Sequence, residues 1–371
     1  MTVRRCTVSA ALLMLCTALT ACQPVFKAKP MTDQETRRVQ EFTAQMKPRC
    51  LGWYVIDFPA AFVLNSESSA QMNDVRIKVK LQDRALFDLH LAARRAQLET
   101  VMLPGKIRNR PQLRATIPLP DKGIGVVFDR SENAASTGRL ARTLELVAWR
   151  DGYRIEATVN ATDTSFPEDA NDSLTTQLKT DVAEKLALLL GVSSKVRGRP
   201  ESEIPTEAGT CIANGFIAGP SSNRQSIQMA YHLDGTQDVY FNLFAQTEVR
   251  EETTMLERSA QIEAEIKGNN TETIRKSARN IRALPYEEWL MRGPTLERVP
   301  GTEFALQANE KGAGPAKPSL ELKFYNGFRI PHPKQSLEEM AQTADLTKAS
   351  LTEAEQLPFG RRSRRRFDRD R

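Results

Sequence analysis

The stretch Cys50-Leu-Gly-Trp-Tyr-Val-Ile-Asp-Phe-Pro59 recurs 161 residues later as Cys211-Ile-Ala-Asn-Gly-Phe-Ile-Ala-Gly-Pro220. The Cys, the central Ile and the Pro keep their register. A second match relates Leu144-Glu-Leu146 with Gly152-Tyr-Arg-Ile155 to Leu320-Glu-Leu322 with Gly327-Phe-Arg-Ile330. Two matches in the same order indicate a duplicated unit. We therefore predict two tandem, related domains.

The local patterns predict strands joined by tight turns, with helices between them. Residues 75–81 alternate apolar and polar, which is typical of a strand with one buried face. Asp-Gly pairs at 151–152 and 234–235 each separate two strand-like runs and predict two-residue hairpins. Apolar stripes predict helices over 87–102, 173–191 and 253–268, and capping boxes predict two more, at Thr32…Glu35 and Ser336…Glu339. Short hairpins require antiparallel pairing, so we expect an α+β fold in which each domain is an antiparallel sheet with packed helices.

Composition shifts set the predicted domain limits. Residues 193–209 contain two Pro and two Gly without apolar periodicity, which is typical of a linker. We predict a signal peptide (1–21), a tether (22–31), an N-terminal α+β domain (32–192), a linker (193–209), a C-terminal α+β domain (210–356) and a basic disordered tail (357–371).

The leader combines Arg4 and Arg5 with an apolar run, Val8 to Leu19, that is too short to span a bilayer. It ends in Leu19-Thr-Ala-Cys22, which resembles the lipobox of bacterial lipoproteins. The resemblance implies that Cys22 is lipidated and becomes the mature N-terminus, anchoring the chain in a membrane. Gln23 follows instead of Asp, which by the same resemblance implies the outer membrane, with the protein facing the periplasm.

Only Cys50 and Cys211 remain in the folded part, since Cys6 and Cys16 leave with the leader. The periplasm permits disulfides. A bridge would close a loop of about 160 residues and stabilise the fold by roughly 4–5 kcal/mol. The alternative is a pair of buried thiols at equivalent positions, and the sequence leaves both open.

The formal charge of +6 comes from the chain ends. The leader contributes +2 and residues 361–371 contribute +5, so residues 22–360 carry −1. We therefore expect no nucleic-acid partner. The basic tail fits either a solvated terminus or attraction to anionic lipid or lipopolysaccharide.

The sequence contains few patterns that are typical of catalytic, cofactor-binding or metal-binding residues. No G-x-S-x-G elbow occurs, and the three histidines, His90, His232 and His332, are not spaced as metal ligands. We predict no catalytic, cofactor-binding or metal-binding residues. The residues that would contact a partner cannot be named from the sequence, because interface and packing residues have the same composition.

The openings of the two repeats resemble the lipase-immunity proteins of the bacterial type VI secretion system. The resemblance is carried by Arg49-Cys-Leu-Gly52 and Tyr54-Val-Ile-Asp-Phe-Pro59, and in the second repeat by Pro205-Thr-Glu207, Gly209-Thr-Cys-Ile212 and Gly215-Phe-Ile217. It extends over residues ~45–350. Trp53 and Ala213-Asn214 depart from the family pattern, which leaves the identity of the cognate toxin open.

The resemblance implies two domains set like a claw, which bind a phospholipase or lipase toxin delivered to the periplasm and inhibit it without catalysis. The alternative is a non-catalytic envelope-assembly lipoprotein of the outer membrane, whose deletion would cause a permeability defect without any toxin. A third hypothesis, a hydrolase, would require a pocket of converging polar groups. A lipase encoded by the neighbouring reading frame would favour the first.

Overall fold

The computed structural model describes residues 30–104, 110–120, 123–135, 140–165, 177–236, 238–281, 284–294, 300–327, 337–349 and 352–353. The predicted signal peptide, Cys22, most of the tether, His332 and the basic tail lie outside the described residues. Among the described residues, no helix is long and apolar enough to cross a membrane.

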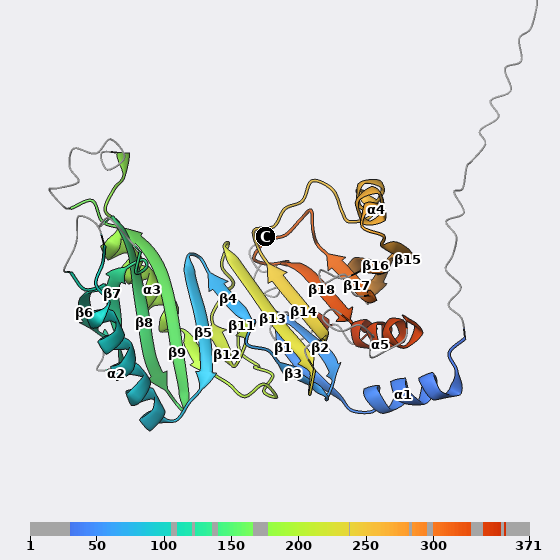
Figure 1. Cartoon of the computed structure of the whole chain (residues 1–371), viewed down its shortest axis with the longest axis horizontal. Coiled ribbons are helices and arrows are strands. Elements are labelled where there is room, and N and C mark those ends of the chain that lie inside the picture. Colours follow the sequence, from blue (N-terminus) through green and yellow to red (C-terminus); the bar gives the residue numbers. More distant parts are fainter. Residues whose placement is uncertain are drawn as a thin grey trace, which may run out of the picture.

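One antiparallel sheet runs through both halves of the chain (Figure 1). Its order is β15-β16-β17-β18-β14-β13-β4-β5-β9-β8-β7-β6, with β3 also paired to β13. The strands of the first half are β3 (Phe62–Leu64), β4 (Ser69–Met72), β5 (Val75–Leu81), β6 (Leu113–Pro118), β7 (Gly125–Ser131), β8 (Ala141–Arg150) and β9 (Tyr153–Thr162). Those of the second half are β13 (Gln225–Leu233), β14 (Val239–Gln246), β15 (Glu272–Ile281), β16 (Leu284–Pro294), β17 (Pro300–Ala308) and β18 (Ser319–Asn326).

Two small sheets lie beside the large one. Strands β1 (Met46–Leu51) and β2 (Tyr54–Pro59) form a hairpin to which β19 (Thr352–Glu353) adds. Strands β11 (Gly209–Ile212) and β12 (Gly215–Ala218) form a second hairpin, and β10 (Val196–Gly198) pairs with β12. The segment 193–209, predicted as a linker, therefore contains a strand, and its Arg199 is fully buried.

The five described helices are α1 (Asp33–Thr43), α2 (Arg84–Thr100), α3 (Val182–Ser193), α4 (Ser259–Gly268) and α5 (Leu337–Ala349). The capping box Thr32…Glu35 is confirmed at α1. Two predicted starts were too early, because α3 begins at Val182 and α4 at Ser259. Gly191 lies inside α3 and does not end it, since the following residues still continue the helix to Ser193. Ser336 lies outside the described residues.

The two halves share one topology, which confirms the prediction of tandem related α+β domains. In each half a hairpin is followed by further strands (β3, β4 and β5 in the first half, β13 and β14 in the second), a helix, a four-stranded meander and a helix. The sheet order 4-5-9-8-7-6 of the first half corresponds to 13-14-18-17-16-15 of the second. The halves meet where the equivalent strands β4 and β13 pair antiparallel, so an approximate twofold axis relates them. The claw-like arrangement stays a prediction.

One of the two repeat matches was wrong. Cys50–Pro59 and Cys211–Pro220 lie on the equivalent hairpins β1-β2 and β11-β12. Leu144 lies on β8, whose counterpart is β17, whereas Leu320 lies on β18. The Leu-Glu-Leu pattern therefore matched non-equivalent strands, because alternation of apolar and charged residues suits any half-buried strand.

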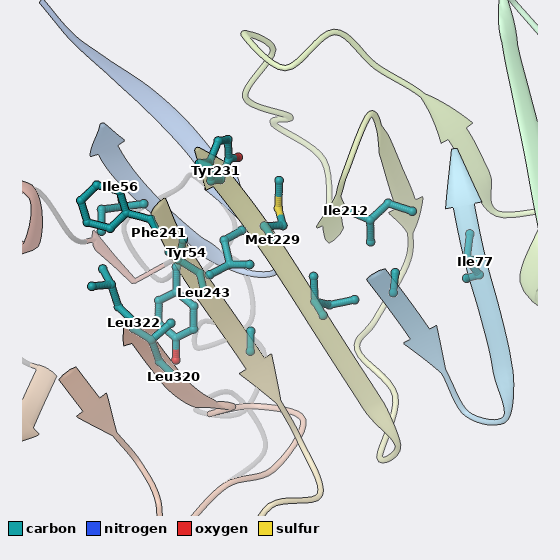
Figure 2. Packing of buried hydrophobic residues seen from close by; sticks show 14 of the residues in the cluster. Tyr54, Ile56, Ile77, Ile212, Met229, Tyr231, Phe241, Leu243, Leu320 and Leu322 are labelled. Carbon is teal, nitrogen blue, oxygen red and sulfur yellow. The ribbon is translucent and has the colours of Figure 1, made fainter. Parts of the chain in front are cut away.

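The equivalent hairpins are exchanged between the halves. Residues of β2 pack into the core of the second half, where Tyr54 and Ile56 lie close to Phe241 (Figure 2). The ring centroids of Phe58 and Phe241 are 4.6 Å apart, and the Tyr54 hydroxyl donates to the Pro318 carbonyl at 3.1 Å. In return, the turn of β11-β12 lies on the first half, where Asn214 Nδ2 donates to the Val79 carbonyl at 3.4 Å. Each half therefore completes its core with a hairpin from the other.

Candidate partner-binding surface

Only one face of the large sheet is covered along its whole length. On the covered face, alternate side chains of the central strands are buried, among them Ile77, Met229 and Phe241, under α3, α5 and the two hairpins. On the opposite face, α2 packs on Phe128 and Val147 near one end of the sheet, and α4 packs near Trp289 and Ala305 at the other. The pairing register places α2 and α4 on this same face, at its two ends (Figure 1).

Between α2 and α4 the sheet presents polar and aromatic side chains that, apart from the buried Arg154, are exposed or partly exposed. We call this surface the open face. In the first half it consists of Arg76, Lys78, Lys80, Arg154, Glu156 and Thr158. In the second half it consists of Tyr240, Asn242, Phe244, Glu321, Lys323 and Tyr325. The strand predicted over 75–81 is confirmed as β5, whose polar residues lie on the open face.

The first half of the open face is cationic. Arg76, Lys78 and Lys80 are exposed and form no ion pair among the described residues. Arg154 lies across from Lys80 and pairs with Glu156 at 3.1 Å. Glu156 is also 3.3 Å from His90 Nε2, and burial together with the Arg154 charge lowers the pKa of His90. Arg154 is buried and paired with Glu156, so Arg76, Lys78 and Lys80 are the exposed cations of this half of the open face.

The second half of the open face is close to neutral and aromatic. The rings of Tyr240 and Tyr325 stack with centroids 4.5 Å apart. Glu321 and Lys323 form an ion pair at 3.0 Å and so cancel each other's charge. On β17, burial raises the pKa of Glu303, which lies beside Tyr325. The two equivalent surfaces therefore differ in chemistry although their backbones correspond.

A notch interrupts the surface at the junction of the halves. A cavity of about 290 Å³ lies between β5 and the segment joining β3 to β4, and Lys78, Lys80, Ser66, Ser69 and Asn214 are among its lining residues. It forms because β4 pairs with β5 only up to Ile77, so the rest of β5 has no described strand on that side.

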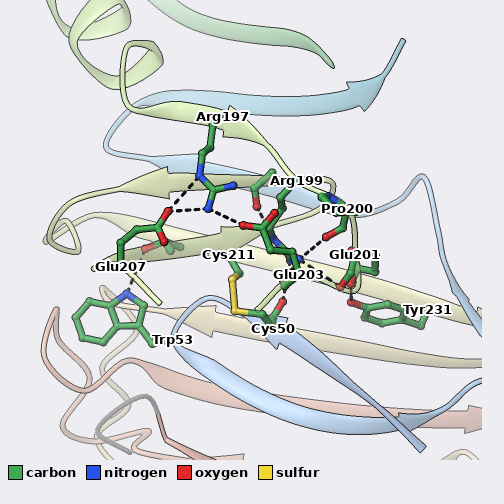
Figure 3. Close-up of a disulfide and its surroundings, with 12 residues drawn as sticks. Cys50, Trp53, Arg197, Arg199, Pro200, Glu201, Glu203, Glu207, Cys211 and Tyr231 are labelled. Atoms are coloured by element: carbon green, nitrogen blue, oxygen red, sulfur yellow. Dashed lines mark hydrogen bonds and ion pairs between the residues drawn. A yellow bond between two sulfur atoms is a disulfide. The ribbon is translucent and has the colours of Figure 1, made fainter. Parts of the chain in front are cut away.

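The junction is held together by a disulfide between Cys50 and Cys211, so the structure has the bridge and not two thiols (Figure 3).

Buried polar side chains beside the disulfide form hydrogen bonds. Arg199 donates to the backbone carbonyls of Pro200, Glu203 and Gly215, which satisfies its buried guanidinium. Tyr231 donates its hydroxyl to Glu201, and burial raises the pKa of that carboxyl. Trp53, one of the departures from the family pattern, donates its indole N–H to Thr210 at 3.2 Å.

The structure brings none of the sequence-named histidines together. His90 is on α2, His232 is on β13 with a buried Nδ1 that lacks a described partner, and His332 lies outside the described residues. No group of three or more His, Cys, Asp or Glu that could hold a metal ion occurs within the described ranges. The open face was not predicted from the sequence, although Arg76, Lys78 and Lys80 on the polar side of one strand indicated a cationic surface.

Comparisons with known proteins agree with this architecture. The family model for the Tle cognate immunity protein 4 N-terminal domain matches residues 47–199, and the model for the C-terminal domain matches residues 203–359. No curated protein matches the chain.

Solved structures share the fold at low sequence identity. The apo structure of the immunity protein TplEi of the T6SS from Pseudomonas aeruginosa has a TM-score of 0.62 at 17% identity, covering 83% of this chain and 97% of that chain. The Tle4-Tli4 complex has a TM-score of 0.62 at 16% identity, covering 84% and 98%. TplEi complexed with the "L" peptide has a TM-score of 0.59 at 16% identity, covering 84% and 99%. Because the two family models together span both halves of the chain, the protein belongs to the Tle cognate immunity protein 4 family.

Proposed function

We propose that this protein is an immunity protein that binds a lipase effector of a type VI secretion system and blocks it, without catalysis of its own. The observation that carries the proposal is the match of both family domains, in order, over residues 47–199 and 203–359. A similar chain was solved in a complex named Tle4-Tli4, in which the relative is bound to its Tle protein. Binding to a cognate Tle lipase is the role that this membership supports.

The open face is the surface that we assign to the effector. The covered face is occupied by α3, α5 and the two hairpins, so it has no free area of comparable extent among the described residues. The open face spans both halves, and α2, which packs on the same face of the sheet, carries the exposed side chains of Leu86 and Leu89. Exposed apolar side chains beside a polar surface are typical of protein interfaces. A partner seated there would contact both domains at once.

The compartment is part of the proposal. The lipobox-like Leu19-Thr-Ala-Cys22 supports a lipid anchor at Cys22, with the folded part in the periplasm and the anchor in the outer membrane. The Cys50–Cys211 disulfide is consistent with an oxidising compartment. An anchored inhibitor would meet a phospholipase at the membrane on which that enzyme acts.

Co-expression tests the function. The lipase that we expect the neighbouring reading frame to encode is exported to the periplasm of a host, with or without the full-length protein, and lysis is followed. We expect lysis only in its absence, and a lipase lacking its nucleophilic Ser serves as the non-toxic control. Lysis that is unchanged by this protein would contradict the proposal.

The anchor is tested separately. A Cys22→Ser variant should lose lipid labelling and leave the membrane fraction, while still binding the lipase in solution. Retention of the variant in the outer-membrane fraction would show that Cys22 is not the anchor.

A further inference from the structure

We propose that the open face recognises an acidic segment of its effector that is flanked by apolar side chains, and that it holds the segment in one orientation. The inference rests on the proposed function and adds to it the chemistry of the bound segment. The cationic half engages the carboxylates, and the aromatic half takes the apolar side chains.

The cationic half has charge available for a partner. Arg76, Lys78 and Lys80 occupy alternate positions of β5, so they project from one face about 6.8 Å apart. Across the pairing to β9, Lys80 is opposite Arg154, which places like charges side by side. Adjacent like charges in a sheet are destabilising. The one carboxylate on this part of the sheet, Glu156, is opposite Lys78 but forms its ion pair with Arg154, so none of the three β5 cations has a described ion-pair partner. An acidic partner would remove this repulsion on binding.

The second half shows that these cations are not a general property of a solvated strand. β14 is the counterpart of β5, and its open-face residues are Tyr240, Asn242 and Phe244. These three side chains are only partly exposed. Beside them, Glu321 and Lys323 form an ion pair that carries no net charge. Aromatic side chains supply large contact area at low entropic cost. The same position in the fold is therefore electrostatic in one half and apolar in the other.

This difference fixes the orientation of the partner. Two halves related by an approximate twofold axis would accept an elongated segment in either of two directions if their surfaces were alike. A segment with carboxylates at one end and apolar side chains at the other satisfies both surfaces in one direction only. In the reverse direction its carboxylates would be desolvated against Tyr240 and Tyr325, which is unfavourable.

Charge reversal with a matched control tests the inference. The open-face triple variant carries Arg76→Glu, Lys78→Glu and Lys80→Glu. The control carries Arg37→Glu, Lys47→Glu and Lys195→Glu, which change the net charge equally at exposed residues of α1, β1 and the segment before β10. All six cations lack described ion-pair partners, so neither variant removes an ion pair, and the unfolding midpoint of each is measured first to establish that it is folded.

Binding kinetics are measured against an inactive form of the lipase expected from the neighbouring reading frame, over a range of salt concentrations. We expect the open-face triple variant to lower the association rate constant at least tenfold at low salt and to flatten its salt dependence. We expect the control to stay within about threefold of the wild type. Phe244→Ser should raise the dissociation rate constant without changing the salt dependence.

Each failure has a distinct meaning. A wild-type protein that does not bind the lipase overturns the proposed function and this inference together. Wild-type binding that the open-face triple variant leaves intact, or that both triple variants weaken equally, overturns the inference alone. If the open-face variant instead loses binding only to vesicles containing anionic phospholipid, the cationic half is a membrane contact and the inference is wrong.

Discussion

Cys50 and Cys211 occupy the same position in the two halves of the fold, and their disulfide lies where the exchanged hairpins cross. Beside it, Gly52 and Cys211 exchange two backbone hydrogen bonds, from Gly52 N–H at 3.0 Å and from Cys211 N–H at 2.9 Å. The disulfide and these two backbone hydrogen bonds thus join the equivalent hairpins β1-β2 and β11-β12. Each hairpin is fixed to its partner at the point where it leaves its own half.

Removing the disulfide should lower stability without changing the fold. The bond closes a loop with a sequence separation of 161, and loss of that constraint in the unfolded chain costs roughly 4–5 kcal/mol. We expect the Cys50→Ala, Cys211→Ala double variant to unfold at a lower urea concentration. Dithiothreitol should shift the wild type in the same way and leave the variant unaffected. Equal midpoints for the oxidised wild type and the variant would contradict this.

The exchanged hairpins predict that neither half folds by itself. A chain ending after residue 201 lacks β11-β12, and a chain starting there lacks Tyr54, Ile56 and Phe58, which are at most 2% exposed in the core of the second half. We expect each half alone to show no cooperative unfolding by circular dichroism. The two halves expressed together should co-purify with a cooperative transition. A sharp transition in one isolated half would show that the exchange is dispensable.

A buried ion pair on the covered face should matter more than an exposed one nearby. Glu288 on β16 is fully buried, pairs with Lys348 of α5 and lies 3.4 Å from Arg275. Asp345 pairs with both cations as well, so Glu288→Gln leaves one carboxylate against two cations and should cost up to about 3–5 kcal/mol. Glu272→Gln removes an exposed pair with Arg292 and should cost less than about 1 kcal/mol. Both are read from urea denaturation, and similar losses for the two variants would refute the assignment.

The junction should make stability depend on pH through Glu201. Burial raises its pKa above the ordinary value of 4.5, although the Tyr231 hydrogen bond and the charges of Arg199 and Arg49 lower it. The folded state thus holds the proton more tightly than the unfolded state, so the stability that protonation gives is lost as pH rises through the folded pKa. Glu201→Gln keeps an acceptor for Tyr231 and carries no charge. Its stability relative to the wild type should therefore increase from pH 4 to pH 8.

The measurement for Glu201 is the urea midpoint of both proteins at each pH. The difference between two proteins removes the contributions of the other titrating groups. These include Asp74, whose lowered pKa acts in the opposite direction. A difference that is constant with pH would mean that Glu201 has no raised pKa in the folded state.

The sequence alone determined the local structure and the duplication. The alternation at 75–81, the Asp151-Gly152 turn and the capping box at Thr32 each act within a few residues, so a local pattern is sufficient to predict them. Asp151 and Gly152 have φ of 48° and 84°, values that a two-residue hairpin requires and that this pair favours. The repeated Cys, Ile and Pro identified the equivalent hairpins, since those residues keep equivalent places in both halves.

Only the tertiary structure decided which strands meet and what the uncovered face presents. The β4–β13 pairing, the exchange of hairpins and the disulfide depend on contacts between residues that are at least 135 positions apart. A half-buried strand shows the same alternation whichever neighbour it has, which is why Leu144 and Leu320 were matched wrongly. For the same reason, the sequence alone indicates only that Arg76, Lys78 and Lys80 lie on the solvent-exposed side of a strand. The register across the sheet places Lys80 opposite Arg154, on the face that α2 and α4 cover only at its two ends.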